Sequence, residues 1–392
     1  MAVRNQEAPR LRVPPTNHSI SLVKKKIVFV VGARPNFMKV APVLQVIRKS
    51  ASDHFDALLV HTGQHYDANM SDVFFQDLEM PAPDRFLGIG SGSHAEQTAK
   101  VMIEMEALLR EVQPDLVVVA GDVNSTLATA IVAAKGGFPL AHIESGLRSF
   151  DRTMPEEINR IVADEFSQFC FVTEPSGSKN LDHEGIESTR VFYVGNTMID
   201  SVMSYIAPAR KRFRSLSEQL GIANNGFALV TLHRPSNVDD ADTLAQLIGL
   251  FEDMRSFAPM ILFPVHPRTR KRLEEFGLAE RVASNTHLEL MDPVGYLDFL
   301  ALQDAAAVVL TDSGGIQEET TALGRPCITL RLNTERPITV DEGTNELLGL
   351  DFPRVLEFAK RAFEGNWKSS KTPELWDGHA ADRIVDILRT AL

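Results

Sequence analysis

Short runs of apolar residues recur along the chain and are separated by longer segments with helical patterning. They occupy residues 26–32, 57–61, 115–122, 139–144, 169–174 and 191–196 in the first half, and residues 227–233, 260–266, 287–293, 306–312 and 327–330 in the second. These runs lack the alternation of polar and apolar residues that a strand with one solvent-exposed face requires. Strands without alternation are covered on both faces, as in parallel sheets flanked by helices. The pattern therefore predicts an α/β protein built from βα units.

The runs form two series of about 150 residues, a usual size for one domain. We predict two doubly wound, Rossmann-like domains, at 25–200 and 201–374, that face each other across a cleft. Residues 1–24 are predicted to be a loose extension, and 375–392 a C-terminal helix. The polar segment "SLSEQLGIANNG" (215–226) precedes the second series, so a hinge is expected near 197–225.

The composition excludes several classes of partner. A formal net charge of −12 argues against a broad nucleic-acid surface, which needs a basic stripe. The apolar runs are shorter than the roughly 20 residues that span a bilayer, so no membrane partner is expected. Cys170 and Cys327 lie in apolar runs and are interpreted as buried free thiols. The first 24 residues lack the apolar core of a signal peptide, and a cytoplasmic location is expected.

Polar side chains gather at or just past the C-terminal ends of the predicted strands. They are Arg34, His61, Asp122, Glu144, Glu174, Asn196, His233, His266, Asp292 and Asp312. Open α/β sheets bind their ligands at this edge. Two domains that turn these edges toward each other would enclose the site between them.

Two segments are predicted to bind an anion such as a phosphate. "VVGARPNFMK" places Arg34 and Lys39 at a strand-to-helix turn, although both could simply be surface cations. "LTDSGGIQEE" (310–319) ends a strand with Ser313 and then offers Gly314 and Gly315 at a helix start, where backbone amides can meet phosphate oxygens. It could also be only a tight turn with a helix cap. Glu318 or Glu319, one turn further on, could accept hydrogen bonds from ribose hydroxyls.

The segment "HIESGLRSFDRTMPEEINR" (142–160) is rich in both acids and arginines. Asp122, Glu144 and Glu156 are candidate acid–base groups near one strand edge. Each has a structural alternative: Asp122 as a helix cap, Glu144 paired with Arg148, and Glu156 in a capping box with Thr153. No His, Cys or carboxylate spacing indicates a metal site, and metal-free chemistry is expected. The residues alone thus predict a phosphorylated ligand in an acid-lined cleft.

At this point the chain resembles one family, the non-hydrolysing UDP-N-acetylglucosamine 2-epimerases, which have the two-domain GT-B architecture. The matching stretches occur in the family's order between residue 27 and about residue 350 and are highly specific as a set. They are "GARPNFMKVAP", "HTGQHYDANM", "GDVNSTLA", "HIESGLRSFDRTMPEEINR", "VGNTMIDS", "TLHRPSN", "FPVHPRT", "LTDSGGIQEE" and "NTERP".

The resemblance implies a role for each matching residue. The catalytic acids are Asp122, Glu144 and Glu156, and His233 matches a histidine at the substrate diphosphate. Arg148, Arg152 and Arg160 are expected to hold the acids in place. The implied substrate-binding residues are Arg34, Lys39, Phe299, Ser313, Gly314, Gly315, Glu319 and Arg336.

The implied reaction is C2 epimerisation of a UDP-2-acetamido sugar, most simply UDP-GlcNAc to UDP-ManNAc. UDP is eliminated with the C2 proton to give a 2-acetamidoglucal, and is then added back with protonation from the other face. This scheme implies no cofactor and no metal, and the family resemblance implies a homodimer. Val294 replaces a glutamine that lies near the uracil in better-known relatives. Tyr66 replaces an arginine of those members that a second UDP-GlcNAc activates, so such activation is in doubt.

Other activities remain open from the sequence. Parts of the motifs also resemble family branches that act on UDP-2,3-diacetamido-glucuronic acid. A GT-B glycosyltransferase would share the fold but transfer the sugar to an acceptor. A hydrolysing epimerase would release UDP, and a nucleotide-sugar sensor would bind without turnover.

Overall fold

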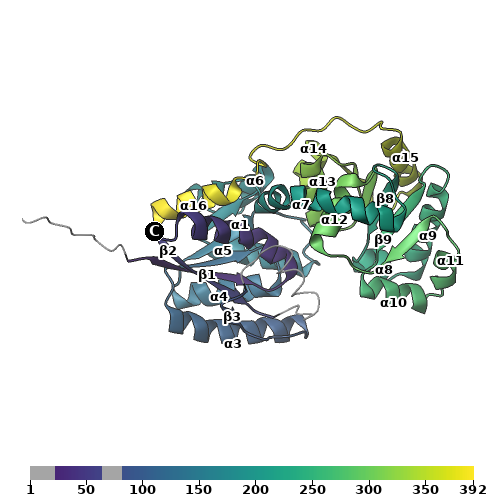
Figure 1. Cartoon of the computed structure of the whole chain (residues 1–392). Coiled ribbons are helices and arrows are strands. Elements are labelled where there is room, and N and C mark those ends of the chain that lie inside the picture. The colour runs from purple at the N-terminus through teal and green to yellow at the C-terminus, as the bar shows by residue number, and fades with distance from the viewer. Residues whose placement is uncertain (1–22, 64–81) are drawn as a thin grey trace, which may run out of the picture.

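The structure is a computed structural model, and it describes residues 23–63 and 82–392, except for the side chain of Arg34. The predicted N-terminal extension and Tyr66 therefore lie almost wholly outside the described residues. The chain forms two parallel sheets flanked by helices, which confirms the predicted α/β class. Figure 1 shows the two sheets side by side along an elongated molecule.

The first sheet is parallel throughout and has the strand order β3-β2-β1-β4-β5-β6-β7. Its strands are β1 (Lys25–Val31), β2 (Phe55–His61), β3 (Arg85–Phe86), β4 (Leu116–Ala120), β5 (Leu140–Ser145), β6 (Phe169–Val172) and β7 (Val191–Tyr193). The order reverses between β1 and β4, which makes the C-terminal ends of these central strands the expected ligand edge.

Helices cover both faces of this sheet because alternate residues of each strand point to opposite faces. Phe29 packs toward α1 (Arg34–Ser50) and α16 (Ala380–Ala391), whereas Val28 and Val30 pack toward α3, α4 and α5. The other helices of this half are α3 (His94–Val112), α4 (Asn124–Gly136), α5 (Pro155–Phe166) and α6 (Pro175–His183), followed by a 3-10 turn at Ser188–Arg190.

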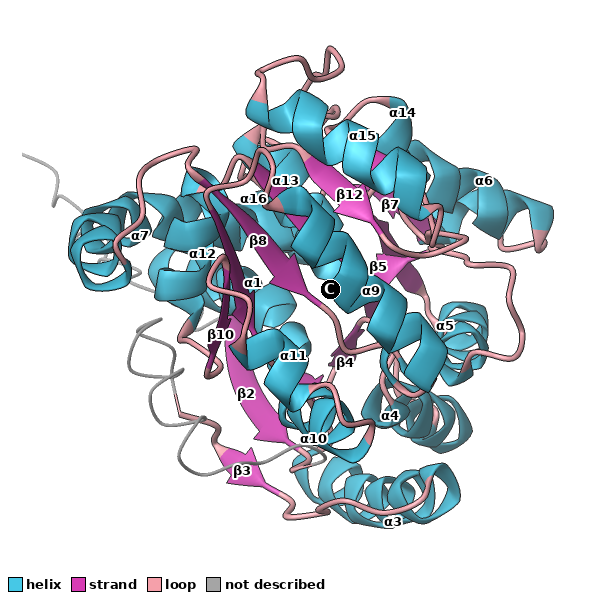
Figure 2. Ribbon diagram, turned by 90° about the vertical axis from the view of Figure 1, so that its right-hand side faces the viewer, coloured by secondary structure: helices cyan, strands magenta, loops and turns pink. Residues whose placement is uncertain are grey.

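The second sheet is also parallel and has the order β10-β9-β8-β11-β12-β13. Its strands are β8 (Phe227–Thr231), β9 (Met260–Pro264), β10 (Leu288–Met291), β11 (Val308–Thr311), β12 (Cys327–Thr329) and β13 (Asn345–Leu347). Its helices are α8 (Pro235–Val238), α9 (Ala241–Met254), α10 (Pro267–Glu275), α11 (Ala279–Ala283), α12 (Tyr296–Ala305), α13 (Gly314–Leu323), α14 (Pro337–Asp341) and α15 (Phe352–Phe363). Figure 2 views the molecule along its long axis, with this sheet in front of the first.

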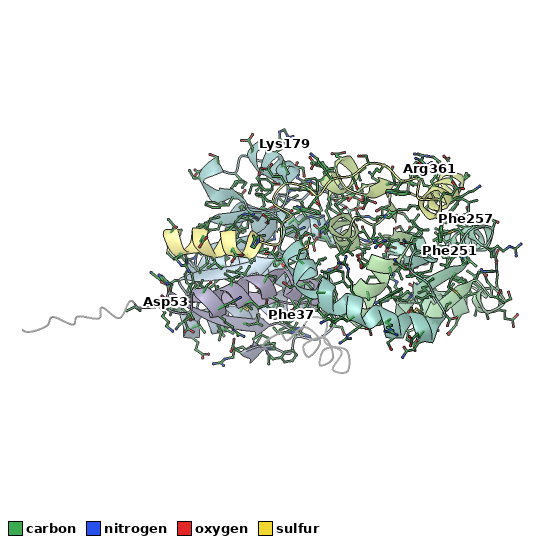
Figure 3. The ribbon with its side chains drawn as sticks, turned by 45° about the horizontal axis from the view of Figure 1, so that its top comes forward. Phe37, Asp53, Lys179, Phe251, Phe257 and Arg361 are labelled. Atoms are coloured by element: carbon green, nitrogen blue, oxygen red, sulfur yellow. The ribbon has the colours of Figure 1, made fainter. Side chains whose placement is uncertain are left out.

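The two sheets have separate cores that a long helix connects. Phe37 belongs to the first core and Phe251 to the second, and Figure 3 shows the two side chains in different halves of the molecule. Helix α7 (Thr197–Leu220) contributes Met198 to the first core, and its later residue Phe213 packs against both that core and a smaller apolar cluster around Leu229 of β8. Most of the expected hinge at 197–225 is therefore continuous helix.

The end of the chain returns to the first sheet. Figure 1 shows the segment after α15 crossing the molecule to α16, which lies beside α1. Asp200 of α7 fixes the start of α16 by accepting hydrogen bonds from the Ala380 and Ala381 amides at 3.2 and 2.7 Å. The domain boundaries given above stay a prediction. In the described ranges no helix is both long and apolar enough to cross a bilayer.

Candidate active site

Three side chains from distant parts of the chain meet at the C-terminal edge of the first sheet. Glu144, at the end of β5, is buried between the ammonium group of Lys39 on α1 and the guanidinium group of Arg336. Arg336 Nη2 donates to Glu144 Oε1 at 2.5 Å. Burial alone would raise the pKa of Glu144, but the two cations outweigh it and lower the pKa. Glu144 is therefore a carboxylate in this state, and the alternative in which it pairs with Arg148 is not observed.

The backbone of Glu144 is in an unusual conformation. Its φ is +73°, in the left-handed region that non-glycine residues adopt only at a cost on the order of 1–3 kcal/mol. The pairing of β5 with β6 shifts register between Ile143 and Ser145, so a bulge turns Glu144 out of the strand. Gly146 follows with φ +78°, and a Cβ there would lie 2.4 Å from the Gly177 carbonyl oxygen. Bulges and left-handed residues of this kind often re-aim a side chain at a functional site.

Asp122 lies in the turn after β4 and is held by α5. Arg160 Nη1 donates to Asp122 Oδ2 at 2.5 Å, and Asn159 donates to the Asp122 carbonyl oxygen at 2.8 Å. Asp122 does not cap α4, whose N-cap is Val123. Arg160 also approaches Glu335 of the second half at 3.9 Å, so its charge connects the two halves of the site.

Glu156 occupies the first turn of α5, next to the Asp122 contacts. Its side chain is half-buried, and within the described part of the chain its carboxylate has no hydrogen bond or ion pair. The alternative capping box with Thr153 is not formed, because the N-cap is Met154 and the Thr153 hydroxyl donates to Asp151 instead. Glu156 thus differs from its neighbour Glu157, which is buried and bound by Ser149, Phe150 and Arg160.

The three arginines of this segment have different partners. Arg160 holds Asp122, as predicted for one of the acids. Arg148 instead pairs with Asp164 at 2.7 Å and with Glu184 at 2.6 Å. Arg152 is exposed and forms no ion pair in the described ranges. Only one of the three therefore contacts a proposed catalytic acid.

His233 follows β8 and faces the site from the second sheet. Its Nδ1 lies 2.9 Å from Asp312 Oδ1, which leaves Nε2 free to turn toward a ligand, and its side chain is 44% exposed. Burial would raise the pKa of Asp312, but the hydrogen bond and charge of His233 and the Arg234 amide lower it. Asp312 therefore orients His233 as an ionised, fully buried partner.

Ser313, Gly314 and Gly315 form the start of α13 next to Arg336. Ser313 is the N-cap residue, yet its hydroxyl makes no capping hydrogen bond. A Cβ on Gly314 would lie 2.4 Å from Arg336 Nη1, so a larger residue here would displace the guanidinium group. The open helix start and the adjacent guanidinium together suit a phosphate group.

Phe299 lies on α12 and Glu319 on α13, and the two helices contact each other. Gln303, one helical turn after Phe299 on α12, donates to Glu319 Oε2 at 2.7 Å. Phe299 is half-buried and packs against a small apolar cluster that includes Leu229 and Leu262 of the second sheet. Gln303 was not predicted, because nothing in its local sequence distinguishes it from other helical glutamines.

Two further buried acids, Glu174 and Glu318, lie near the Arg336 guanidinium group. Arg336 Nε is 2.8 Å from Glu318 Oε1, and Asn196 donates to the same oxygen at 3.0 Å. Burial raises the pKa of Glu318, against the charge of Arg336. Burial also raises the pKa of Glu174 to about 7, with the nearby charge of Glu318 in the same direction. The sequence predicts Glu174 at the strand edge, and it offers Glu318 as an alternative to Glu319 for the ribose hydroxyls.

The structure thus brings Lys39, Asp122, Glu144 and Arg336 into one connected charge network and places Glu156, His233 and Ser313 on the elements around it. The side chain of Arg34 lies outside the described residues. Within 23–63 and 82–392, no group of three or more His, Cys, Asp or Glu side chains is arranged to hold a metal ion.

Comparisons with known proteins show what the whole chain is similar to. The sequence model of the UDP-N-acetylglucosamine 2-epimerase family matches residues 48–389. The UDP-N-acetylglucosamine 2-epimerase of Methanocaldococcus jannaschii is 42% identical, over 93% of this chain and 98% of the relative. The UDP-2,3-diacetamido-2,3-dideoxy-D-glucuronate 2-epimerase of Pseudomonas aeruginosa is 37% identical, over 93% and 99%.

A solved structure extends the agreement to the fold. The crystal structure of the M. jannaschii UDP-GlcNAc 2-epimerase in complex with UDP-GlcNAc and UDP matches with a TM-score of 0.85 and 42% identity, over 93% of this chain and 99% of that one. The GT-B architecture and the resemblance inferred from the motifs are confirmed. The chain belongs to the UDP-N-acetylglucosamine 2-epimerase family.

Proposed function

We propose that the protein interconverts the C2 epimers of a UDP-2-acetamido sugar, with UDP-GlcNAc as the first substrate to test. The observation that carries this is the pairing of Glu144 with Lys39 and Arg336 across the two halves of the site, next to Asp122 and the start of α13. Acids for proton transfer and cations for a diphosphate leaving group are thereby placed side by side.

The chemistry explains why both kinds of group are needed. The hydrogen on C2 of the sugar is not acidic, so direct deprotonation is slow. Elimination of UDP together with the C2 proton gives a 2-acetamidoglucal, and UDP adds back as C2 takes a proton from the other face. One group must accept the proton and another must donate it, while cations stabilise the UDP that leaves and returns.

We assign proton transfer to Glu156, Asp122 and Glu144. Glu156 is half-buried and has no competing partner among the described residues, which leaves its carboxylate available to a substrate. Asp122 is 26% exposed and fixed by Arg160, so it is accessible and oriented. Glu144 shares its cations with the incoming diphosphate. A bound diphosphate would compete for Lys39 and Arg336 and would thereby raise the proton affinity of Glu144.

The nucleotide is assigned to the second half of the site. The open start of α13 and Ser313 would bind the diphosphate together with His233 Nε2. Phe299 and Glu319 would contact uracil and ribose, with Gln303 holding the Glu319 carboxylate. Arg34 is assigned to the same diphosphate by family resemblance alone.

The sugar substituents are a separate part of the proposal. UDP-2,3-diacetamido-glucuronic acid is the second candidate, because a relative at 37% identity is named for it. Purified protein should be incubated with each sugar nucleotide, and the anomeric proton signal of the manno product followed by NMR. Conversion of either sugar to an equilibrium mixture supports the proposal. Stoichiometric release of free UDP indicates hydrolysis, and turnover only with an added acceptor indicates a glycosyltransferase.

We also propose a homodimer, on family resemblance and on one surface. Phe150 and Ile158 are 77% and 49% exposed, and Ile158 lines an apolar groove between α3, α4 and α5. A second copy that covered this groove would bury both side chains. Light scattering should give twice the 43.4 kDa chain mass. The cytoplasmic location stays an expectation, which cell fractionation would test.

A further inference from the structure

A buried histidine outside the proposed catalytic set links the elements that carry two of the acids. His142 lies in β5, two residues before Glu144, and is completely buried. Its Nε2 is 2.8 Å from the carbonyl oxygen of Gly121, the residue before Asp122. Its Nδ1 is 2.6 Å from Asp164 Oδ1 on α5, the helix that carries Glu156. One imidazole ring therefore contacts the β4 turn and α5 from β5.

Both ring nitrogens of His142 face hydrogen-bond acceptors. The Gly121 carbonyl oxygen can only accept, so Nε2 donates to it. Asp164 also accepts from the Gly146 amide at 3.0 Å and from Arg148 at 2.7 Å, as an ionised carboxylate does. The Nδ1 contact therefore joins the ring to a carboxylate that two further donors hold in place. Burial would raise the pKa of Asp164, but the charges of His142 and Arg148 lower it.

Charged groups from three elements surround the His142 ring. Asp164 faces it from α5, and Arg148 from the loop after β5 contacts Asp164 on the other side. Glu184, at the end of α6, accepts two hydrogen bonds of 2.6 and 2.8 Å from Arg148. His142, Asp164 and Arg148 are buried and hydrogen-bonded there, whereas Glu184 reaches the surface.

The same network fixes the backbone on both sides of Glu144. Asp164 binds the His142 ring before Glu144 and the Gly146 amide after it. The Ser145 hydroxyl donates to the His142 carbonyl oxygen at 2.8 Å across the bulge. Glu144 is thus held at φ +73° by bonds from its two flanks rather than by its own side chain alone.

We propose that His142, held by Asp164, is a positioning residue for the epimerisation, which sets the Gly121–Asp122 turn and the Glu144 bulge in register with each other. This role rests on the proposed function. His142 touches no substrate in this scheme, and its effect reaches the reaction through Asp122 and Glu144. Its loss should therefore lower kcat, on the order of 100-fold for a displacement near 1 Å, with KM changed by less than about 3-fold.

Two substitutions by amide residues distinguish the two hydrogen bonds of the His142 ring, one to Asp164 and one to Gly121. The Asn side chain of His142→Asn reaches the position of Nδ1 and can keep the Asp164 contact, but not the Gly121 contact. The longer side chain of His142→Gln reaches the position of Nε2 and can donate to Gly121. If the Gly121 link positions Asp122, then His142→Gln should recover at least about 10-fold of the kcat that His142→Asn loses. Phe251→Leu, in the core of the second half, is the control for a general loss of stability.

The experiment measures kcat, KM and Tm of the wild type and these three variants with UDP-GlcNAc and the diacetamido uronic acid analogue. We expect a loss of kcat in His142→Asn beyond that of Phe251→Leu, with KM almost unchanged, and recovery of kcat in His142→Gln.

Each contrary result has its own meaning. A His142→Gln variant as slow as His142→Asn overturns the role of the Gly121 link and the proposal with it. An active wild type with both His142 variants no slower than Phe251→Leu overturns the positioning role and leaves the proposed function standing. A wild type that converts neither sugar overturns the proposed function, and the role of His142 falls with it.

Discussion

Glu144 accepts a 2.5 Å hydrogen bond from Arg336, which lies 192 positions further along the chain. Both side chains are buried, and Arg336 also contacts Glu318 at 2.8 Å and Glu335 at 3.5 Å. One guanidinium group therefore compensates three carboxylates that come from both halves of the molecule. The same group lies against Gly314, at the helix start proposed to bind the diphosphate. Changes in ligand charge would act directly on this network.

Removal of the Arg336 charge should destabilise the protein strongly. Arg336→Met leaves Glu144, Glu318 and Glu335 with less compensation, and breaking a buried pair in this way costs about 3–5 kcal/mol. Urea unfolding measures the loss. The control is Arg281→Met, which breaks a half-exposed pair with Glu252 and should cost about 1 kcal/mol or less. Equal losses in the two variants would contradict the central position of Arg336.

Glu156 and Glu157 are neighbours, but Glu156 is predicted to transfer a proton and Glu157 to stabilise the fold. Glu156→Gln should lower kcat by about 10²–10⁴-fold because it removes a proton-transfer group, and it should leave Tm almost unchanged. Glu157→Gln should instead lower stability by about 1–3 kcal/mol, because the Glu157 carboxylate is buried under hydrogen bonds from Ser149, Phe150 and Arg160. Steady-state kinetics and thermal unfolding of both variants test the assignment. Near-normal turnover of Glu156→Gln would remove Glu156 from the mechanism.

Two serines at helix starts give a further matched pair. The Ser313 hydroxyl makes no capping bond, so Ser313→Ala should keep its stability and raise KM about 10-fold, as expected for a lost bond to a charged group. Ser93 accepts from the Glu96 amide as the N-cap of α3, so Ser93→Ala should lose about 1 kcal/mol of stability with KM unchanged. An unchanged KM in Ser313→Ala would argue against diphosphate binding at this helix start.

Glu174 should make stability depend on pH near neutrality. Burial raises its pKa in the folded state from 4.5 to about 7, so the folded protein binds more protons than the unfolded chain between these values. Stability therefore falls as pH rises from about 5 to about 8, by on the order of 3 kcal/mol if Glu174 acts alone. Glu174→Gln removes this term and should gain relative to the wild type over that range.

Unfolding at several pH values measures this difference directly. The raised pKa of Asp200 is present in both proteins and cancels in the comparison. The control is Glu218→Gln on the exposed face of α7, which should follow the wild type at every pH. A stability difference between Glu174→Gln and wild type that does not change with pH would contradict the raised pKa of Glu174.

The strands and the edge that carries the site were predictable because their physical signals are local. Continuous apolar runs such as 115–122 indicate strands covered on both faces, and the next polar residue marks the C-terminal edge. Most of the predicted runs extend one to three residues past the observed strands, for example where the chain turns at Asp122 and Asp312. The two edge strands β3 and β13 were missed because they are short and contain Arg85 and Asn345.

The partners of the charged residues could not be predicted, because they depend on how distant elements pack. Glu318 and Glu319 are adjacent and both buried, but neighbouring helical side chains point in directions about 100° apart. One therefore meets Arg336 and the other Gln303. Asp164 gave no signal in the sequence, since a mid-helix acid beside Glu165 has the pattern of a solvent-exposed face. Its role appears only when β5 and α5 are packed together.

The most direct test of the central claim is proton NMR of the wild type with UDP-GlcNAc in D₂O. Elimination and re-addition of UDP require a proton from a protein acid that exchanges with solvent, so the account predicts deuterium at C2 of the manno product. A parallel run with the diacetamido uronic acid analogue covers the second candidate sugar. An epimer formed with its original C2 proton retained would contradict the account, as would two sugars that both remain unconverted.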